Sequence, residues 1–137
     1  MSTRIFIDSN IWLYAKLDGS DVVKTERARS CLLADGEMVI SSQIILEVGN
    51  NLLKKGKLGE TRVRLHLTDL LDACELVALD RAVILAASAL RTSGAWSYWD
   101  SFVVAAALES GCTELWSEDL QTGRVIEGRL TIVNPLA

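Results

Sequence analysis

The sequence contains a single proline and a single histidine, and no stretch of it is compositionally biased. The proline, Pro135, stands close to the end, so no proline-rich linker divides the 137 residues. The longest apolar runs, such as residues 103–108, are much too short to cross a bilayer, and no signal-peptide pattern opens the chain. Half of the residues are hydrophobic, which is enough for a substantial core. We therefore expect one folded domain spanning residues 1–137, in the cytoplasm and with no membrane partner.

Cysteine and histidine are too few and too scattered to build several familiar kinds of site. Cys31, Cys74 and Cys112 are odd in number and form no close pair, which is typical of free thiols in a reducing compartment. With His66 as the only histidine, a zinc site is disfavoured. A Ser-His-Asp triad would have to use the same histidine, and no nucleophile-elbow pattern is present. Phosphate-binding glycine motifs are missing as well.

Lysine is missing after position 57, and the net charge is −4. Five basic residues nevertheless crowd into one short segment that is opposed only by Glu60, namely Lys54, Lys55, Lys57, Arg62 and Arg64. If carboxylates elsewhere hold metal ions, this patch can still bind the phosphate backbone of a nucleic acid. An ordinary solvated helix face is the alternative, and on charge alone it is the better interpretation.

Short apolar segments alternate with amphipathic ones along the chain. We predict strands at residues 4–7, 38–40, 75–78, 114–116 and 130–133. Helices are predicted at about residues 10–16, 21–34, 42–55, 60–72, 80–92 and 98–111. This alternation is typical of an α/β fold with a mostly parallel sheet flanked by helices on both faces. In such sheets, ligands bind beyond the carboxyl ends of the strands.

Four acidic residues fall where separate segments would bring carboxylates to that end of the sheet. Asp8 ends the first strand and Asp119 follows the fourth, while Asp100 opens the last helix and Glu47 flanks the apolar stripe of the third. Each has an ordinary explanation: Asp8 as a helix cap, Glu47 as a surface glutamate, Asp100 as part of a capping box, and Asp119 as a turn residue.

Together the four carboxylates indicate a different chemistry. Carboxylates at close range repel one another and need cations or shared protons. Mg²⁺ and Mn²⁺ prefer all-oxygen sites and phosphate substrates. The set therefore indicates a metal-dependent phosphodiesterase, most simply a ribonuclease.

Five short motifs follow one another over nearly the whole chain. They are Phe6-Ile-Asp-Ser-Asn-Ile-Trp, Ile45-Leu-Glu-Val, Tyr98-Trp-Asp-Ser-Phe-Val-Val-Ala-Ala-Ala, Leu115-Trp-Ser-Glu-Asp-Leu-Gln-Thr-Gly and Ile132-Val-Asn-Pro. In this order and spacing they resemble the PIN domain family, and within it the VapC-type toxins of bacterial type II toxin–antitoxin systems.

The resemblance implies a five-stranded parallel sheet flanked by helices, and an endoribonuclease that uses Mg²⁺ or Mn²⁺. It implies that the metal ligands and catalytic residues are Asp8, Glu47, Asp100 and Asp119, assisted by Asn10 and Ser117. It also implies an RNA substrate, a homodimer, and a cognate antitoxin that binds over the active-site groove. Glu118 adds a carboxylate that either holds metal through water or is simply exposed.

Metal-activated water would hydrolyse the RNA backbone and leave 5′-phosphate and 3′-hydroxyl ends. The alternative is a catalytically idle PIN-fold module that binds RNA or a partner protein, since four carboxylates alone do not prove turnover. Two other acidic-site families fit poorly. A haloacid-dehalogenase-type phosphatase needs an aspartate at the position of Asn10, and a response-regulator receiver needs a lysine near the last strands, where none follows Lys57.

Overall fold

The computed structural model describes residues 3–137, and these form six strands and six helices. The strands are β1 (Arg4–Ile7), β2 (Glu37–Ser41), β3 (Glu75–Val77), β4 (Glu114–Trp116), β5 (Val125–Ile126) and β6 (Leu130–Val133). The helices are α1 (Ser9–Lys16), α2 (Val22–Cys31), α3 (Ser42–Lys54), α4 (Glu60–Ala73), α5 (Arg81–Ser93) and α6 (Tyr98–Glu109). Among the described residues, none of the helices combines the length and the apolar character of a membrane-spanning segment.

The strands form one sheet in the order β3-β2-β1-β4-β6-β5. The first five in that order run parallel to their neighbours, which confirms the mostly parallel α/β sheet. The expected count of five strands misses β5, which pairs antiparallel with β6 at the edge. Glu127 and Gly128 both have positive φ in the turn between them, as a tight hairpin requires. A two-residue strand is too short to give a periodic sequence signal.

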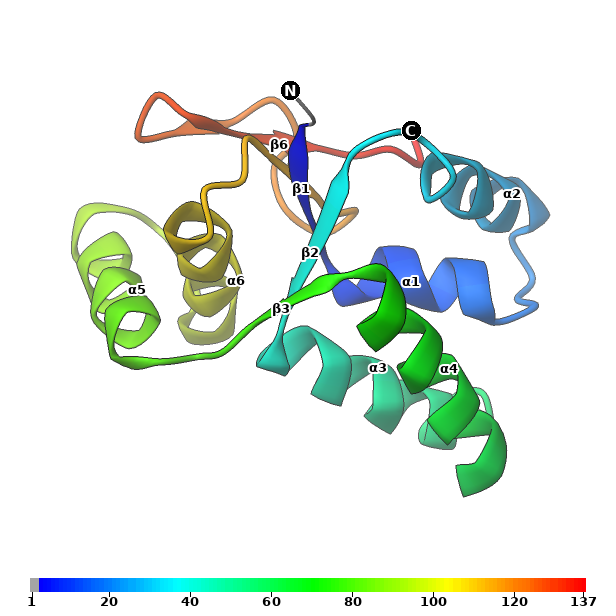
Figure 1. Ribbon diagram of the computed structural model, residues 1–137. Helices are drawn as coiled ribbons and strands as arrows, with labels where there is room; N and C mark the ends of the chain where they lie inside the picture. The colour runs from blue at the N-terminus through cyan, green and yellow to red at the C-terminus, as the bar shows by residue number, and fades with distance from the viewer. Residues whose placement is uncertain (1–2) are drawn as a thin grey trace.

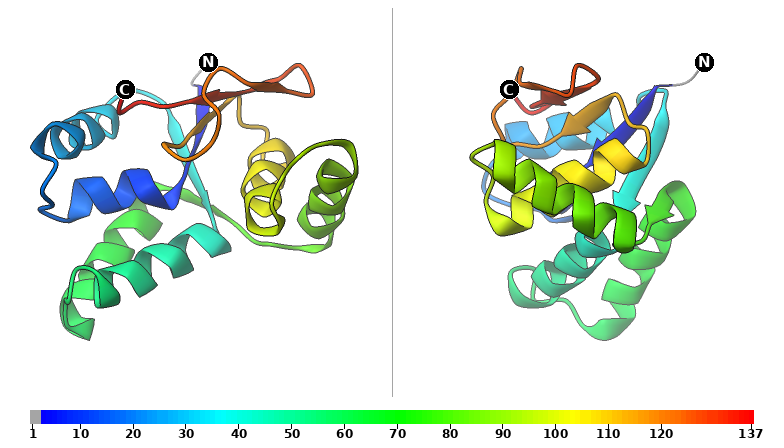
Figure 2. Two further views of the ribbon diagram at one scale, coloured as in Figure 1. Left: turned by 180° about the vertical axis from the view of Figure 1, so that it is seen from behind. Right: turned by 90° about the vertical axis from the view of Figure 1, so that its left-hand side faces the viewer.

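Helices cover both faces of this sheet. Figure 1 shows α5 and α6 on one side of the sheet and α1 and α2 on the other. Helix α3 packs against both α1 and α4, and these helices stay together in the views from behind and from the side (Figure 2). Because β1, β2 and β4 are parallel neighbours, the residues that follow them come to the same edge of the sheet.

The most deeply buried helix is α6, in which every residue from Ser101 to Leu108 is buried. It contacts β2 and β4 on the sheet side and α5 on the other. A helix covered on both sides is apolar all round, which explains the run of valine and alanine in its sequence. The body of α6 is therefore anchored in the core, directly after the first turn in which Asp100 lies.

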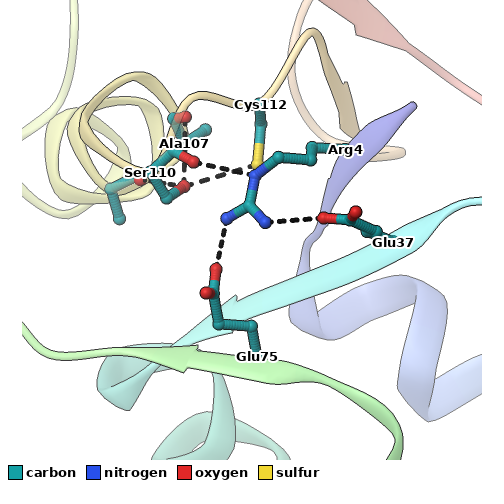
Figure 3. A network of polar contacts seen from close by, with 7 residues as sticks. Arg4, Glu37, Glu75, Ala107, Ser110 and Cys112 are labelled. Carbon is teal, nitrogen blue, oxygen red and sulfur yellow. Dashed lines mark hydrogen bonds and ion pairs between the residues drawn. The ribbon is translucent and has the colours of Figure 1, made fainter. Parts of the chain in front are cut away.

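A polar cluster around Arg4 lies at the edge of the sheet where β1 begins, opposite to the edge at which Asp8 lies (Figure 3). The Arg4 guanidinium pairs with Glu37 of β2 at 2.7 Å and with Glu75 at the start of β3. Its Nε donates to the carbonyl oxygen of Ser110, just after α6, at 3.0 Å. One side chain thus joins three strands to the end of α6. Since Arg4 begins β1 and Asp8 follows its end, this cluster is separate from the acidic residues.

Candidate active site

Asp8 lies directly after β1 and is buried, with 9% of its surface exposed. Its Oδ1 accepts a hydrogen bond from the Ser9 amide at 2.8 Å, so Asp8 is the N-cap of α1. Its Oδ2 accepts from the Ser117 hydroxyl, also at 2.8 Å. The capping explanation for Asp8 is therefore correct, and the same carboxylate also contacts the residue that follows β4.

Burial raises the pKa of Asp8 from 3.8 to about 6. Hydrogen bonds from Ser117 and Ser9 lower this pKa, while the negative charges of Glu47 and Asp119 raise it. Three of the four predicted carboxylates thus lie close enough to repel one another. Within residues 3–137, no lysine, arginine or histidine forms an ion pair with any of the four.

Glu47 reaches the site from α3 and is held at both carboxylate oxygens. Its Oε2 accepts from the Ser9 hydroxyl at 2.8 Å, and its Oε1 accepts from Gln43 Nε2 at 2.9 Å. The side chain is only partly exposed. A glutamate that simply extends into water would not need two protein donors, so the surface-glutamate explanation does not describe Glu47.

Asn10 and Ser117 connect Asp119 to this group. Asn10 donates through Nδ2 to Asp119 Oδ2 at 3.0 Å. The fully buried Ser117 hydroxyl donates to Asp8 and accepts from the backbone amide of Asp119 at 3.2 Å. Each of the two predicted assisting residues therefore contacts a predicted ligand, and the Ser117 hydroxyl bridges two of them.

Asp100 lies in the first turn of α6 and is partly exposed. Its backbone amide donates to Ser97 Oγ at 3.2 Å, so Ser97 caps the helix. The Asp100 carboxylate makes no hydrogen bond or ion pair with any residue from 3 to 137, so it completes no capping box. Gln43 Nε2 also donates to the Trp99 carbonyl at 3.3 Å, which holds the start of α6 against the start of α3. Asp100 is therefore placed at the same edge without being bonded to the other three carboxylates.

Glu118, the additional carboxylate near this site, is paired with other side chains of the protein. It forms an ion pair with Lys24 at 2.5 Å and accepts a hydrogen bond from the Tyr14 hydroxyl at 3.0 Å. Only 19% of its side chain is exposed. Glu118 instead holds α1 and α2 against the loop that carries Asp119.

The five basic residues are all exposed and run from the end of α3 into the first half of α4. Lys55 lines a cavity of about 330 Å³ together with Asn10 and Asp119, so it is the one that lies beside the acidic group. Arg62 and Lys55 also line a neighbouring cavity of about 430 Å³. The remaining three, Lys54, Lys57 and Arg64, line neither cavity.

The donor set suits a divalent cation, although the side chains do not converge on one point. Among residues 3–137, no three Asp, Glu, His or Cys side chains are arranged as metal ligands. The predicted ligands supply only oxygen donors, which Mg²⁺ and Mn²⁺ prefer. None of the four forms an ion pair with a cationic side chain of the described chain. The Asp100 carboxylate is the one of the four that no hydrogen bond from residues 3–137 holds in place.

The cysteines offer no competing chemistry. All three are unpaired, as expected, and Cys112 is buried. Burial raises the pKa of Cys74 to about 12, which keeps it a thiol rather than a nucleophilic thiolate.

Two residues that hold Glu47 are not among the predicted site residues. Gln43 lies four positions before Glu47 in α3, and i, i+4 spacing places both side chains on one face of the helix. Ser9 is adjacent to Asp8 in the sequence. The helical spacing could have identified Gln43, whereas the contact between Ser9 and Glu47 depends on how α1 packs on α3.

The fold and the site define an α/β protein with an acidic site at the carboxyl edge of a parallel sheet. The chain belongs to the PIN domain family, whose family model matches residues 5–126. This confirms the family predicted from the five motifs. A search of curated proteins found no match.

Several solved structures share the fold at low sequence identity. A toxin–antitoxin complex from Klebsiella pneumoniae is 21% identical over 96% of this chain and 97% of that chain, with a TM-score of 0.71. VapC20 of Mycobacterium tuberculosis, described as a sarcin–ricin loop cleaving toxin, is 15% identical over 84% and 91%, with a TM-score of 0.65. VapBC2 of Rickettsia felis, bound to a promoter DNA fragment, is 14% identical over 96% and 100%, with a TM-score of 0.66. The chain therefore shares its fold with solved structures that contain VapC-type toxins.

Proposed function

We propose that this protein is a metal-dependent endoribonuclease that acts as the toxin of a type II toxin–antitoxin pair. The observation that carries the proposal is the buried Asp8 carboxylate, which lies near Glu47 and Asp119 with no ion-paired cation in the described chain. A bound divalent ion stabilises such a group. Membership of the PIN domain family and the likeness to a toxin described as sarcin–ricin loop cleaving support the same function. We expect it to work as one domain over residues 1–137, in the cytoplasm.

The proposed metal ligands and catalytic residues are Asp8, Glu47, Asp100 and Asp119. Asn10 orients Asp119 and Ser117 orients Asp8, through the hydrogen bonds described above. A bound Mg²⁺ or Mn²⁺ would offset the carboxylate charge, lower the pKa of water and polarise the scissile phosphate. His66, the only histidine, lies in α4 and is not among these residues.

The proposed RNA-binding residues are Lys54, Lys55, Lys57, Arg62 and Arg64. Their exposure and the absence of ion pairs to them within residues 3–137 leave their charge available to phosphates. Lys55 supports this role most strongly because it shares a cavity with Asp119.

The proposed protein partners are a cognate antitoxin and a second copy of the chain. Structures with this fold include a toxin–antitoxin complex and VapBC and FitAB assemblies bound to DNA. Leu46 and Leu53 of α3 and Leu65 of α4 are exposed, at 71%, 39% and 63%. Leu46 and Leu53 stand seven positions apart, so they lie on one face of α3, where a partner protein would cover them.

The function can be tested by incubating purified protein with end-labelled total RNA in Mg²⁺, in Mn²⁺ and in chelator. We expect fragments with either metal and none with chelator, and none from Asp8→Asn under any condition. Asp72→Asn, which changes an exposed aspartate of α4, is the matched control and should cleave like the wild type. Equal cleavage by the wild type and Asp8→Asn would contradict the proposal.

A catalytically idle PIN-fold module is the second candidate. The observation in its favour is that the carboxylates of the described chain do not form a ready ligand set. Such a module would bind RNA or a partner protein equally well in metal and in chelator, and it would produce no fragments.

A further inference from the structure

Gln43 lies in the first turn of α3 and is 8% exposed. Its Nε2 donates to Glu47 Oε1 at 2.9 Å and to the Trp99 carbonyl at 3.3 Å. An ionised carboxylate and a carbonyl can only accept hydrogen bonds, so the amide nitrogen must be the atom that faces them. The orientation of the Gln43 side chain therefore follows from its partners.

We propose that Gln43 is a positioning residue of the acidic site: it fixes the Glu47 carboxylate and ties α3 to the start of α6, where Asp100 lies. The inference rests on the proposed function, because it assigns a role within the same metal site. The Ser9 hydroxyl holds the other oxygen of Glu47 at 2.8 Å. With one donor on each oxygen, the carboxylate cannot turn away into solvent, and each oxygen keeps a lone pair for a cation.

The amide oxygen of Gln43 indicates that this side chain has a role beyond packing. Its Oε1 is buried and has no hydrogen-bond partner among the described residues. A buried acceptor without a donor is costly, so an apolar side chain of similar length would suit a purely structural position better. A water that enters the acidic site with an ion would supply the missing donor.

A structural role and a positioning role predict different results for ion binding. A glutamine that only joins α3 to α6 would affect stability and leave the affinity of the site for a cation unchanged. A glutamine that orients a ligand would change that affinity. Side chains that orient metal ligands from outside typically change metal affinity 10–100-fold when they are lost.

The test is isothermal titration of the full chain with Mn²⁺ alone, for the wild type, Gln43→Met and Asn50→Met. Gln43→Met keeps the length of the side chain and removes both donated hydrogen bonds. We expect its Mn²⁺ affinity to fall about 10-fold or more. Asn50→Met, at an exposed position of the same helix, should bind like the wild type. An affinity of Gln43→Met equal to that of the wild type would overturn the inference and leave the proposed function standing. Failure of the wild type to bind Mn²⁺ would overturn both.

A second variant keeps the test decisive if Gln43→Met does not fold. Gln43→Asn keeps the amide but shortens the side chain by one methylene, so its nitrogen no longer reaches Glu47 Oε1. We expect a smaller rise in melting temperature on addition of Mn²⁺ than for the wild type, because the Glu47 carboxylate is no longer held. A rise equal to that of the wild type would contradict the positioning role of Gln43.

Discussion

Asp8 has a structural role, and its carboxylate lies in an electrostatically unfavourable position. Asp8 caps α1 and accepts a hydrogen bond from the Ser117 hydroxyl. Its burial and the nearby charges of Glu47 and Asp119 nevertheless disfavour its ionised form. Two hydrogen bonds do not fully offset the loss of water around the carboxylate, because its pKa remains raised. The position is therefore unfavourable for the metal-free protein and favourable for a bound cation.

A dependence of stability on pH follows from this residue. The folded pKa of Asp8, about 6, lies above its ordinary value of 3.8, so the folded state prefers the protonated form. Protonation of Asp8 therefore stabilises the folded state. This stabilisation is complete below pH 4 and is lost as the pH rises through 6. A shift of this size corresponds to about 3 kcal/mol of unfolding free energy at neutral pH. Urea denaturation of the metal-free protein from pH 4 to pH 7 measures it.

Asp8→Asn is the comparison for this measurement. In chelator, the wild type should lose stability between pH 4 and pH 7 while Asp8→Asn does not, because asparagine does not ionise. The unfolding free energy of the variant minus that of the wild type should therefore increase by about 3 kcal/mol over this range. Parallel pH profiles for the two proteins would show that Asp8 titrates normally.

The residues that could be predicted from the sequence are those whose positions follow from the ends of strands and helices. Asp8 and Ser117 follow β1 and β4, so their proximity was predictable once a parallel sheet was expected. The ion pair of Glu118 with Lys24 joins a loop to α2 and has no local sequence signal. The contact of Ser9 with Glu47 likewise depends on how two helices pack.

The stability of helix α6 depends on its N-terminal cap. Ser97 is the N-cap, and its hydroxyl accepts a hydrogen bond from the Asp100 amide. Ser97→Ala should therefore lower the unfolding free energy by about 1 kcal/mol. Ser97→Asp, which keeps an acceptor, should restore most of that loss. Unchanged stability in Ser97→Ala, measured by urea denaturation, would show that Ser97 contributes little as a cap.

The elements were predictable where the periodicity was long and the boundaries were marked by capping residues. Asp80 and Ser97 cap α5 and α6 as their sequence context indicates. The segment at residues 21–34 is shorter as a helix than expected, because α2 ends at Cys31 and turns follow it. Strand β5 was missed because its two residues carry no alternation and only pairing with β6 defines it.

The Arg4 cluster joins three strands and the end of α6 at the edge of the sheet opposite the acidic site. Arg4→Met should lower the unfolding free energy by about 1 kcal/mol at low salt and by less in 1 M salt, since the two glutamates are half exposed. Arg81→Met, at an exposed position without an ion pair in the described chain, is the control. An equal effect of both changes would mean that the cluster adds nothing specific.

The basic segment and the acidic edge together define the proposed RNA path. In an Asp8→Asn background, Lys55→Met should weaken binding of single-stranded RNA and reduce the slope of log affinity against log salt by about 0.7, as expected for one lost phosphate contact. Fluorescence anisotropy at several salt concentrations measures this slope. An unchanged slope would exclude Lys55 from the path and favour a solvated helix face.

We propose that the carboxylates at the edge of the sheet use a divalent ion to hydrolyse RNA. The most direct measurement is the chemical identity of the fragment ends produced by the wild type in Mg²⁺ or Mn²⁺. We predict 5′-phosphate and 3′-hydroxyl ends, because water rather than the 2′-hydroxyl attacks the phosphate. Fragments ending in a 2′,3′-cyclic phosphate, or no fragments with either metal, would contradict hydrolysis by metal-activated water.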